Sequence, residues 1–247
     1  MRPLDLGRET PSCGHCHSTP RLRSLVRCLT IAIIGRPGTI AELPSTCSGL
    51  GLSDHPFLAD ALTSAVDYRN THYHKEPMMD ITEPSKSWLE SADFLLSSDV
   101  FEHVVPPVQR AFDGALAVLR PGGHLILTVP FDPSGFLPET LEHFPELNVW
   151  TIDGRSGDTP TLRNTTVDGR IQLFDQLIFH GGDGLTLEMR LFEERALIRN
   201  LETAGFVDIT VHDESDLEYG IFWTSRASVP ISARRPYGVT SSTTAMS

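Results

Sequence analysis

The residues best suited to chemistry follow a short apolar run near the middle of the chain. The run Phe94–Leu96 breaks into Ser98 and Asp99, and Glu102 and His103 follow a few residues later. Because an imidazole has an unperturbed pKa near neutrality, His103 could act as a general base that deprotonates a hydroxyl or an amine. We therefore take His103 as the candidate catalytic residue, at the end of a predicted strand.

The elements on either side explain why these residues would lie at a strand end. Val108–Leu119 has apolar residues at helical spacing, and Arg120–Gly123 ends that helix with a proline and two glycines. Leu125–Val129 is almost wholly apolar, as expected of a strand covered on both faces. With Phe94–Leu96 as the preceding strand, the segment is a βαβ unit and implies a parallel sheet. In such sheets ligands bind at the carboxyl ends of the strands, where Ser98 and Asp99 lie.

The segments ADFLLSSDVFEHV and LRPGGHLILTVP resemble the central and post-central motifs of class I S-adenosylmethionine-dependent methyltransferases, closest to the small-molecule, type 11-like group. The resemblance implies an α/β fold with a doubly wound, Rossmann-like, mostly parallel sheet, and S-adenosyl-L-methionine as the cofactor. Ser98 and Asp99 would then face the cofactor. The Glu102–His103 pair also resembles a structural signature of this fold, with the histidine beneath the cofactor, and we favour that role over the general base.

A glycine-rich turn after the first strand lies beneath the cofactor in this family. Gly49 and Gly51 fit that turn, and Ser53 takes the place of the third glycine. The apolar pattern over 57–66 would supply the helix that follows. The segment Glu42–Cys47 is a poor first strand, because it is short, polar and interrupted by a proline.

The resemblance also implies residues for the adenosine part of the cofactor. Relatives usually carry an acid at the end of the second strand, which accepts hydrogen bonds from both ribose hydroxyls; here Asn70 could substitute. Asp80 resembles the carboxylate that faces the exocyclic amine of adenine, and Ile81 or Met79 would offer the ring an apolar face. The other interpretation of Asp80 is a strand-end acid that caps a turn.

Beyond Pro130 the pattern changes to short segments with turn residues. We predict an inserted, β-rich lid over residues 131–185, with a hairpin at Val167–Arg170 and a glycine-rich loop after His180. Lids of this kind exclude water and shape specificity. His143 and His180 are the candidate substrate-binding residues.

The last third of the chain completes the predicted domain. A helix over 193–204 ends at Gly205, a strand covers 207–211, and an antiparallel last strand falls within 220–232. We divide the chain into a lead-in with a Cys-x-x-Cys and a helix (1–36), a methyltransferase-like domain (37–232) and a disordered tail (233–247).

Charge and hydropathy limit the partners. The formal net charge of −12 disfavours nucleic acid, since phosphate binding needs a basic surface. The sequence has no apolar run of transmembrane length and no signal-peptide pattern, so we expect a cytoplasmic protein without a membrane partner.

All four cysteines lie in the first fifth of the chain. Cys13 and Cys16 have the spacing of half a zinc site, which Cys28, His15 or His17 could complete. Because no second Cys-x-x-Cys follows, we predict no metal, with zinc as the alternative.

These patterns together predict methyl transfer from S-adenosylmethionine to an O-, N- or C-nucleophile of a small molecule. The alternative is a methyltransferase-like domain that binds a ligand or partner without catalysis. A nicotinamide-dependent reductase is disfavoured, because its Tyr-x-x-x-Lys pair is absent. The sequence leaves the acceptor and the oligomeric state open.

Overall fold

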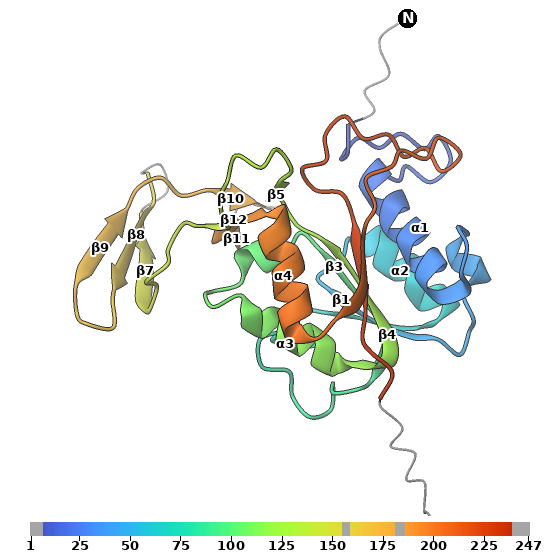
Figure 1. Ribbon diagram of the computed structural model, residues 1–247, viewed down its shortest axis with the longest axis horizontal. Helices are drawn as coiled ribbons and strands as arrows, with labels where there is room; N and C mark the ends of the chain where they lie inside the picture. The colour runs from blue at the N-terminus through green and yellow to red at the C-terminus, as the bar shows by residue number, and fades with distance from the viewer. Residues whose placement is uncertain (1–6, 155–158, 181–185, 239–247) are drawn as a thin grey trace, which may run out of the picture.

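The computed structural model describes residues 7–154, 159–180 and 186–238. Its centre is a six-stranded sheet in the order β13-β14-β4-β3-β1-β2 (Figure 1). The strands are β1 (Ser48–Leu52), β2 (Asp67–Thr71), β3 (Ala92–Ser98), β4 (Leu119–Thr128), β13 (Val207–Val211) and β14 (Ile231–Arg234). β1 to β4 pair in parallel, and β14 is antiparallel to both β4 and β13. The predicted fold class, a mostly parallel α/β sheet with an antiparallel last strand, is confirmed.

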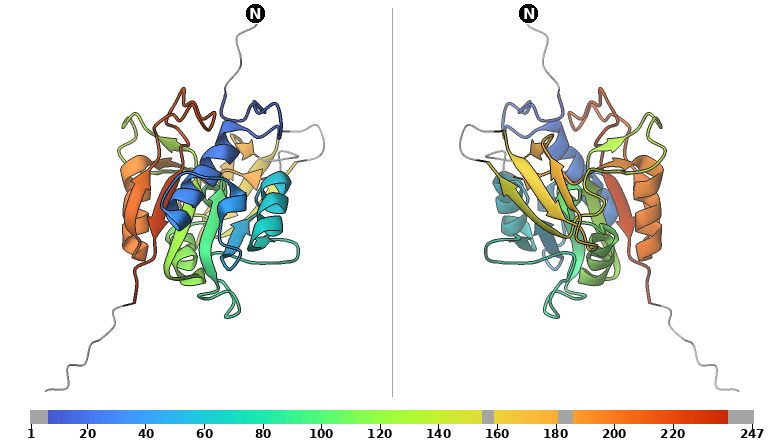
Figure 2. Two further views of the ribbon diagram at one scale, coloured as in Figure 1. Left: turned by 90° about the vertical axis from the view of Figure 1, so that its right-hand side faces the viewer. Right: turned by 90° about the vertical axis from the view of Figure 1, so that its left-hand side faces the viewer.

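Helices cover both faces of this sheet, as Figures 1 and 2 show. α1 (Pro20–Ile34) and α2 (Pro56–Ala65) pack on one face with Phe94 and Leu96 of β3. α3 (Gln109–Val118) and α4 (Glu194–Ala204) pack on the other with Leu95. Successive side chains of a strand point to opposite faces, so a continuous apolar run supplies both cores.

The helix ends follow local capping rules. The Thr19 side chain accepts from the Leu22 N–H (3.3 Å) before Pro20 at the start of α1, and Gly35 ends that helix at φ 75°. α4 begins at Glu193, whose carboxylate accepts from the N–H groups of Arg195 and Ala196. These signals are local, so both helices lie close to their predicted positions.

Several predicted boundaries are wrong. The first strand is β1, which contains both glycines of the expected turn, and five residues separate it from the short 3-10 helix η1 (Ile40–Glu42). β4 begins at Leu119, so Arg120–Gly123 lies inside that strand instead of forming a turn between helix and strand. The last strand, predicted within 220–232, is β14 and begins at Ile231. Arg234 still pairs with His124 of β4, so the chain remains in the sheet past the predicted start of the tail at 233. The end of the sheet at Arg234 is determined by pairing with a strand more than a hundred residues earlier, which the local composition does not predict. The rest of the predicted tail, 239–247, lies outside the described residues.

The segment between β4 and α4 is rich in short strands, as predicted. β5 (Phe131–Asp132), β6 (Leu141–Glu142) and β12 (Arg190–Glu193) form one small sheet. β7 (Val149–Asp153), β8 (Thr161–Thr165) and β9 (Ile171–Phe174) form an antiparallel sheet that projects away from the main one (Figure 1). The predicted hairpin joins β8 and β9, with Gly169 at φ 85°. β10 (Phe179–His180) pairs with β11 (Thr186–Leu187), and the glycine-rich loop predicted between them, 181–185, lies outside the described residues.

No helix within the described part of the chain is both long and apolar enough to cross a membrane.

Candidate active site

Polar residues gather at the edge of the sheet where the parallel strands end. β1, β2, β3 and β4 point the same way, so their carboxyl ends share one edge. Ser53 and Asp99, just after β1 and β3, have φ of 56° and 55°, so the chain leaves both strands through left-handed conformations. Ser53, Ser98 and Asp99 therefore all lie at this edge.

Asp54 is a buried carboxylate in the turn after β1. Its backbone N–H donates to Asn70 Oδ1 (2.9 Å), and its carbonyl accepts from Asn70 Nδ2 (3.0 Å). The Tyr68 hydroxyl donates to Asp54 Oδ2, while Oδ1 has no hydrogen-bond partner among the described residues. Burial raises the pKa of Asp54 to about 7, against the opposing effects of the Tyr68 hydrogen bond and the Arg21 charge. An unpaired buried oxygen of this kind is suited to accept an N–H or O–H from a ligand.

Replacing Asp54 with asparagine is expected to remove a pH dependence of stability. The pKa of Asp54 is about 7 in the fold against a usual 3.8, so between these values the folded state binds a proton that the unfolded state lacks. The stability from this proton is present at low pH and is lost as the pH rises to neutrality, by about 4 kcal/mol. An amide does not titrate in this range, so the free energy of unfolding of Asp54→Asn should rise relative to that of the wild type as the pH rises.

Urea unfolding at pH 5 and pH 8 measures this difference. Asp60→Asn, on the exposed side of α2, is the matched control and should follow the wild type at both pH values. An equal difference between Asp54→Asn and the wild type at the two pH values would contradict the prediction.

Gly49 and Gly51 lie inside β1, so the prediction that they form a turn is wrong, while their contact with the cofactor stays a prediction. A Cβ on Gly49 would overlap the Phe94 ring, and a Cβ on Gly51 would overlap the Tyr68 hydroxyl and the Asp54 carboxylate. The absence of side chains therefore makes room for residues of the neighbouring strands. At Gly51 this room is what lets Tyr68 reach Asp54.

Two arginines from the N-terminal segment close the edge above β3. Arg8 donates to both oxygens of the Asp99 carboxylate, each at 2.9 Å. Arg21 donates to Ser98 Oγ at 2.6 Å and to both carboxylate oxygens of Glu9 at 2.7 and 2.9 Å. Burial opposes the charge on Arg21, but the Glu9 hydrogen bonds and the Asp99 charge outweigh it and raise the Arg21 pKa. Guanidinium and carboxylate groups thus lie side by side at the predicted cofactor edge.

The side chains predicted for the adenosine part are already engaged. Both polar atoms of the Asn70 amide bond to the backbone of Asp54, so a ribose would have to displace that backbone to bind the same amide. Asp80 Oδ1 accepts from the Thr82 N–H (2.8 Å) and hydroxyl (2.7 Å), as the turn-capping interpretation expects. Ile81 is 5% exposed and belongs to the core, so it presents no open face to a ring. The cofactor roles of Asn70, Asp80 and Ile81 stay predictions.

Three histidines that the sequence suggested separately meet around Glu188. His143 Nε2 lies 2.9 Å from Glu188 Oε1, and His180 Nε2 lies 2.5 Å from Oε2. The His103 ring centroid is 5.9 Å from that of His180, and His103 Nδ1 bonds to the Leu187 carbonyl at 2.8 Å. We call His103, His143, His180 and Glu188 the histidine cluster.

Glu102 connects the two parts of the site. It lies in η2 (Phe101–His103), directly after β3, and its backbone oxygen accepts from the Met189 N–H (2.8 Å). Burial raises its pKa well above the usual value, and the charges of Asp99 and Glu188 act in the same direction. Glu102 therefore holds a proton more readily than an exposed glutamate, and its pKa responds to the charges of both Asp99 and Glu188.

Sequence reasoning missed Asp54, Arg8, Arg21 and Glu188. Asp54 directly follows Ser53, and an acid at a strand end is itself a signal that could have identified it. Arg8 and Arg21 lie in a segment that resembled a lead-in, and Glu188 lies in a short strand connection. Nothing local to these three residues marks them, because their partners are distant in sequence.

The cysteines form no comparable centre. Among residues 7–154, 159–180 and 186–238 no group of three or more His, Cys, Asp or Glu side chains is placed to hold a metal ion. Burial raises the pKa of Cys28 to about 12 and that of Cys47 to about 11, so both thiols are protonated core residues. Hydrogen bonds from the backbone of Cys16 and His15 lower the pKa of Cys13 to about 7.

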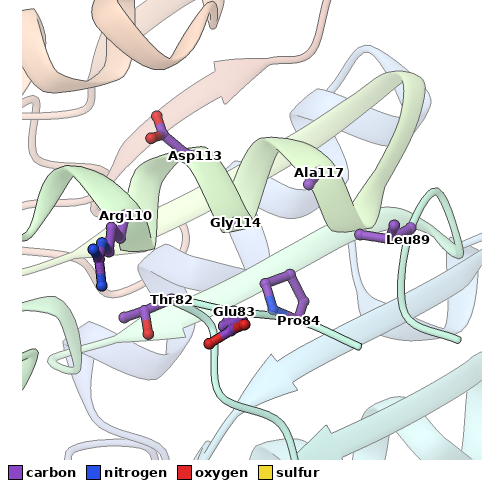
Figure 3. Close-up of a pocket in the computed structure, with 8 residues that line it drawn as sticks. All are labelled: Thr82, Glu83, Pro84, Leu89, Arg110, Asp113, Gly114 and Ala117. Atoms are coloured by element: carbon purple, nitrogen blue, oxygen red, sulfur yellow. The ribbon is translucent and has the colours of Figure 1, made fainter. Parts of the chain in front are cut away.

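A surface groove of about 530 Å³ runs between α3 and the segment before β3 (Figure 3). It is lined by Thr82, Glu83, Pro84, Leu89, Arg110, Asp113, Gly114 and Ala117. None of these is a predicted site residue, and the groove does not include the polar carboxyl edge.

Residues 50–127 match a family model described as a methyltransferase domain. The match extends from β1 nearly to the end of β4 and so covers the strands that build the site. The resemblance to class I S-adenosylmethionine-dependent methyltransferases is thereby confirmed. A search of curated proteins found no match to the chain.

Similar solved structures include a 1,6-didemethyltoxoflavin N1-methyltransferase from Burkholderia thailandensis with its substrate and S-adenosylhomocysteine bound. It is 14% identical over 87% of this chain and 78% of its own, with a TM-score of 0.46. The glycopeptide N-methyltransferase MtfA, complexed with sinefungin, is 12% identical over 87% and 94% of the two chains (TM-score 0.48). An S-adenosylmethionine-dependent methyltransferase from Clostridium acetobutylicum is 12% identical over 90% and 93% (TM-score 0.46).

Proposed function

We propose that this protein transfers a methyl group from S-adenosyl-L-methionine to a small-molecule acceptor. The observation that carries the proposal is the coincidence of the family match with the polar edge. The matched segment contains β1 to β4, and their carboxyl ends carry Asp54, Ser98 and Asp99. The cofactor would lie at this edge, and the acceptor would reach it from the side of the histidine cluster.

The residues at the edge fit the amino-acid end of the cofactor. That end carries an ammonium and a carboxylate, which need an acceptor and a cationic donor. Asp54 Oδ1 is a buried acceptor without a hydrogen-bond partner in the described residues, and the Arg21 guanidinium acts on Asp54 by its charge. Asp80, with one oxygen not used by Thr82, would accept from the adenine amine. The bound cofactor supplies an activated methyl group, so the protein mainly has to align the acceptor with it.

His103 is the residue we propose closest to the acceptor. It follows β3 directly, and the Asp99 charge contributes to its pKa, so it lies near the strand end that the cofactor would face. Burial lowers the pKa of His103, although the bond to the Leu187 carbonyl raises it in part. A neutral imidazole at this position is able to accept a proton or a hydrogen bond.

Calorimetric titration with S-adenosylmethionine and S-adenosylhomocysteine tests the proposal. We expect both to bind, and Asp80→Ala to weaken binding about tenfold, because one charge-assisted hydrogen bond contributes about 1.5 kcal/mol. Asp67→Ala is the control, because Asp67 begins β2 at the opposite edge of the sheet. Absence of binding to the wild-type protein would refute the enzyme hypothesis, and unchanged affinity in Asp80→Ala would show that adenine lies elsewhere.

The second candidate is a methyltransferase-like domain that binds without transferring methyl. This candidate is favoured by the hydrogen bonds that already engage the edge. Arg8 donates to Asp99, Arg21 donates to Ser98, and the Asn70 side chain bonds to the backbone of Asp54. Incubation with methyl-labelled cofactor and an extract of the host separates the candidates. Label transferred to a small molecule by wild-type protein, and not by a heated sample, supports the enzyme.

A further inference from the structure

We propose that Glu188 organises the histidine cluster into a proton-accepting site for a neutral or cationic acceptor that carries an O–H or N–H. The inference rests on the proposed methyl transfer and names the class of acceptor. Glu188 is a positioning residue in this proposal, and His103 is the group that contacts the acceptor.

The cluster is assembled from segments far apart in the chain. His103 lies in η2, His143 follows β6, and His180 ends β10. Glu188 lies between β11 and β12, and its side chain is only 9% exposed. Its own N–H donates to the Ile178 carbonyl (2.8 Å), which holds the carboxylate in place. A buried carboxylate between two imidazoles requires both as donors, because a carboxylate only accepts.

Hydrogen bonding determines which imidazole nitrogen is basic. The Leu187 carbonyl can only accept, so His103 Nδ1 carries the proton and the lone pair lies on Nε2. The Glu188 carboxylate likewise accepts from Nε2–H of His143 and of His180, leaving their lone pairs on Nδ1. The Leu187 carbonyl thus sets the tautomer of His103, and the Glu188 carboxylate sets those of His143 and His180.

The groups around His103 act on its pKa in opposite directions. Burial would raise the Glu188 pKa, but the hydrogen bonds from His143 and His180 outweigh it and hold the pKa below the usual value, so Glu188 is ionised. Burial lowers the pKa of His103 below its usual value, and the hydrogen bond to the Leu187 carbonyl and the charges of Glu188 and Asp99 offset part of that effect. The Glu102 Oε1 atom lies 3.7 Å from His103 Nε2, and burial raises the Glu102 pKa well above its usual value.

The acceptor class follows from these features. With neutral histidines the cluster carries the negative charge of Glu188, which repels a carboxylate or phosphate acceptor. Basic imidazole nitrogens bind O–H and N–H donors. A thiol ionises without such help, and it would gain little from the cluster.

The proton balance of the transfer is then complete. The acceptor heteroatom bonds to the methyl carbon, the C–S bond breaks, and its electron pair stays on sulfur as a neutral thioether. The acceptor proton passes to His103 Nε2, where the Glu188 charge stabilises the imidazolium. His180, whose side chain is 46% exposed beside His103, leads to solvent, where the proton is released.

Nitrogen-15 NMR of the histidine rings in the full-length protein tests the positioning role without turnover. In the wild type we expect the Nδ1–H tautomer for His103 and the Nε2–H tautomer for His143 and His180. Glu188→Gln should disturb the tautomers of His143 and His180 and lower the His103 pKa, whereas the exposed Glu139→Gln should change neither. Unchanged tautomers and pKa values in Glu188→Gln would overturn the proposal.

Methylation of matched probes tests the acceptor class. With labelled cofactor we expect turnover of catechol, and none of benzoate at its carboxylate. Glu188→Gln should lower catechol turnover about 10- to 100-fold and move the acid limb of the pH profile to lower pH, because removing the charge makes His103 less basic. Glu188→Asp should restore part of the rate. A protein that binds S-adenosylhomocysteine but methylates catechol at equal rates with and without Glu188 would overturn the inference and leave the proposed function standing. A protein that binds no cofactor would overturn the proposed function itself.

Discussion

Replacing Arg190 with alanine is expected to lower the free energy of unfolding by about 3 kcal/mol, because it removes the fully buried partner of a half-buried ion pair. Arg190 is fully buried; its Nε donates to Glu142 Oε1 (2.7 Å) and its Nη1 donates to the Phe101 carbonyl (2.7 Å). The guanidinium also lies 5.9 Å from the Phe192 ring centroid. The substitution leaves the Phe101 carbonyl without this donor and Glu142 without its cation, and it opens a cavity beside η2.

Urea unfolding at pH 7 measures the effect. The control is Arg195→Ala, on the exposed face of α4, which should stay within about 0.5 kcal/mol of the wild type. The double substitution Arg190→Met with Glu142→Leu should be less destabilising than Arg190→Ala, because no unpaired charge remains. A loss below about 1 kcal/mol in Arg190→Ala would show that the pair is not buried as described.

The Gly114→Ala variant is expected to be less stable by about 2–3 kcal/mol, although alanine is the better helix former by about 1 kcal/mol. A Cβ on Gly114 would overlap the backbone oxygen of Ile81, which lies against α3. Backbone cannot rotate aside as a flexible side chain can, so either α3 or the segment around Ile81 must shift. That segment includes Asp80, and cofactor affinity should fall together with stability.

Thermal unfolding of Gly114→Ala measures this loss. The matched control is Gly14→Ala, where a Cβ meets no atom within 4 Å, and its midpoint should stay near that of the wild type. Stabilisation of Gly114→Ala, as helix propensity alone expects, would refute the close approach of α3 to Ile81.

Local physics made much of the fold predictable. The spacing of apolar residues identified α2 and α3, and Gly205 marked the end of α4. The apolar runs of β3 and β4 predicted strands buried on both faces, and the helix between them implied parallel pairing. Each of these signals depends on a few neighbouring residues, so it can be recognised from the sequence alone.

The glycines of β1 show that a local sequence pattern does not always predict the structural role of a residue. Gly49 and Gly51 have the spacing of a turn, yet they serve the side chains of Phe94 and Tyr68 on neighbouring strands. A glycine that makes room for a distant side chain has the same local pattern as one that turns the chain. The same ambiguity affects Asp80, because one of its carboxylate oxygens accepts hydrogen bonds from Thr82 within its own turn.

The sequence by itself determined the fold class, the order of the elements and the strand ends at Ser98 and Asp99, because periodicity, caps and chain direction are local properties. Only the tertiary structure brought Arg8 to Asp99 across 91 residues and His143 to Glu188 across 45. Those contacts depend on strand pairing and on how the inserted segment folds back over η2. The chemistry proposed here therefore begins with residues the sequence already suggested and depends on partners that only the fold supplies.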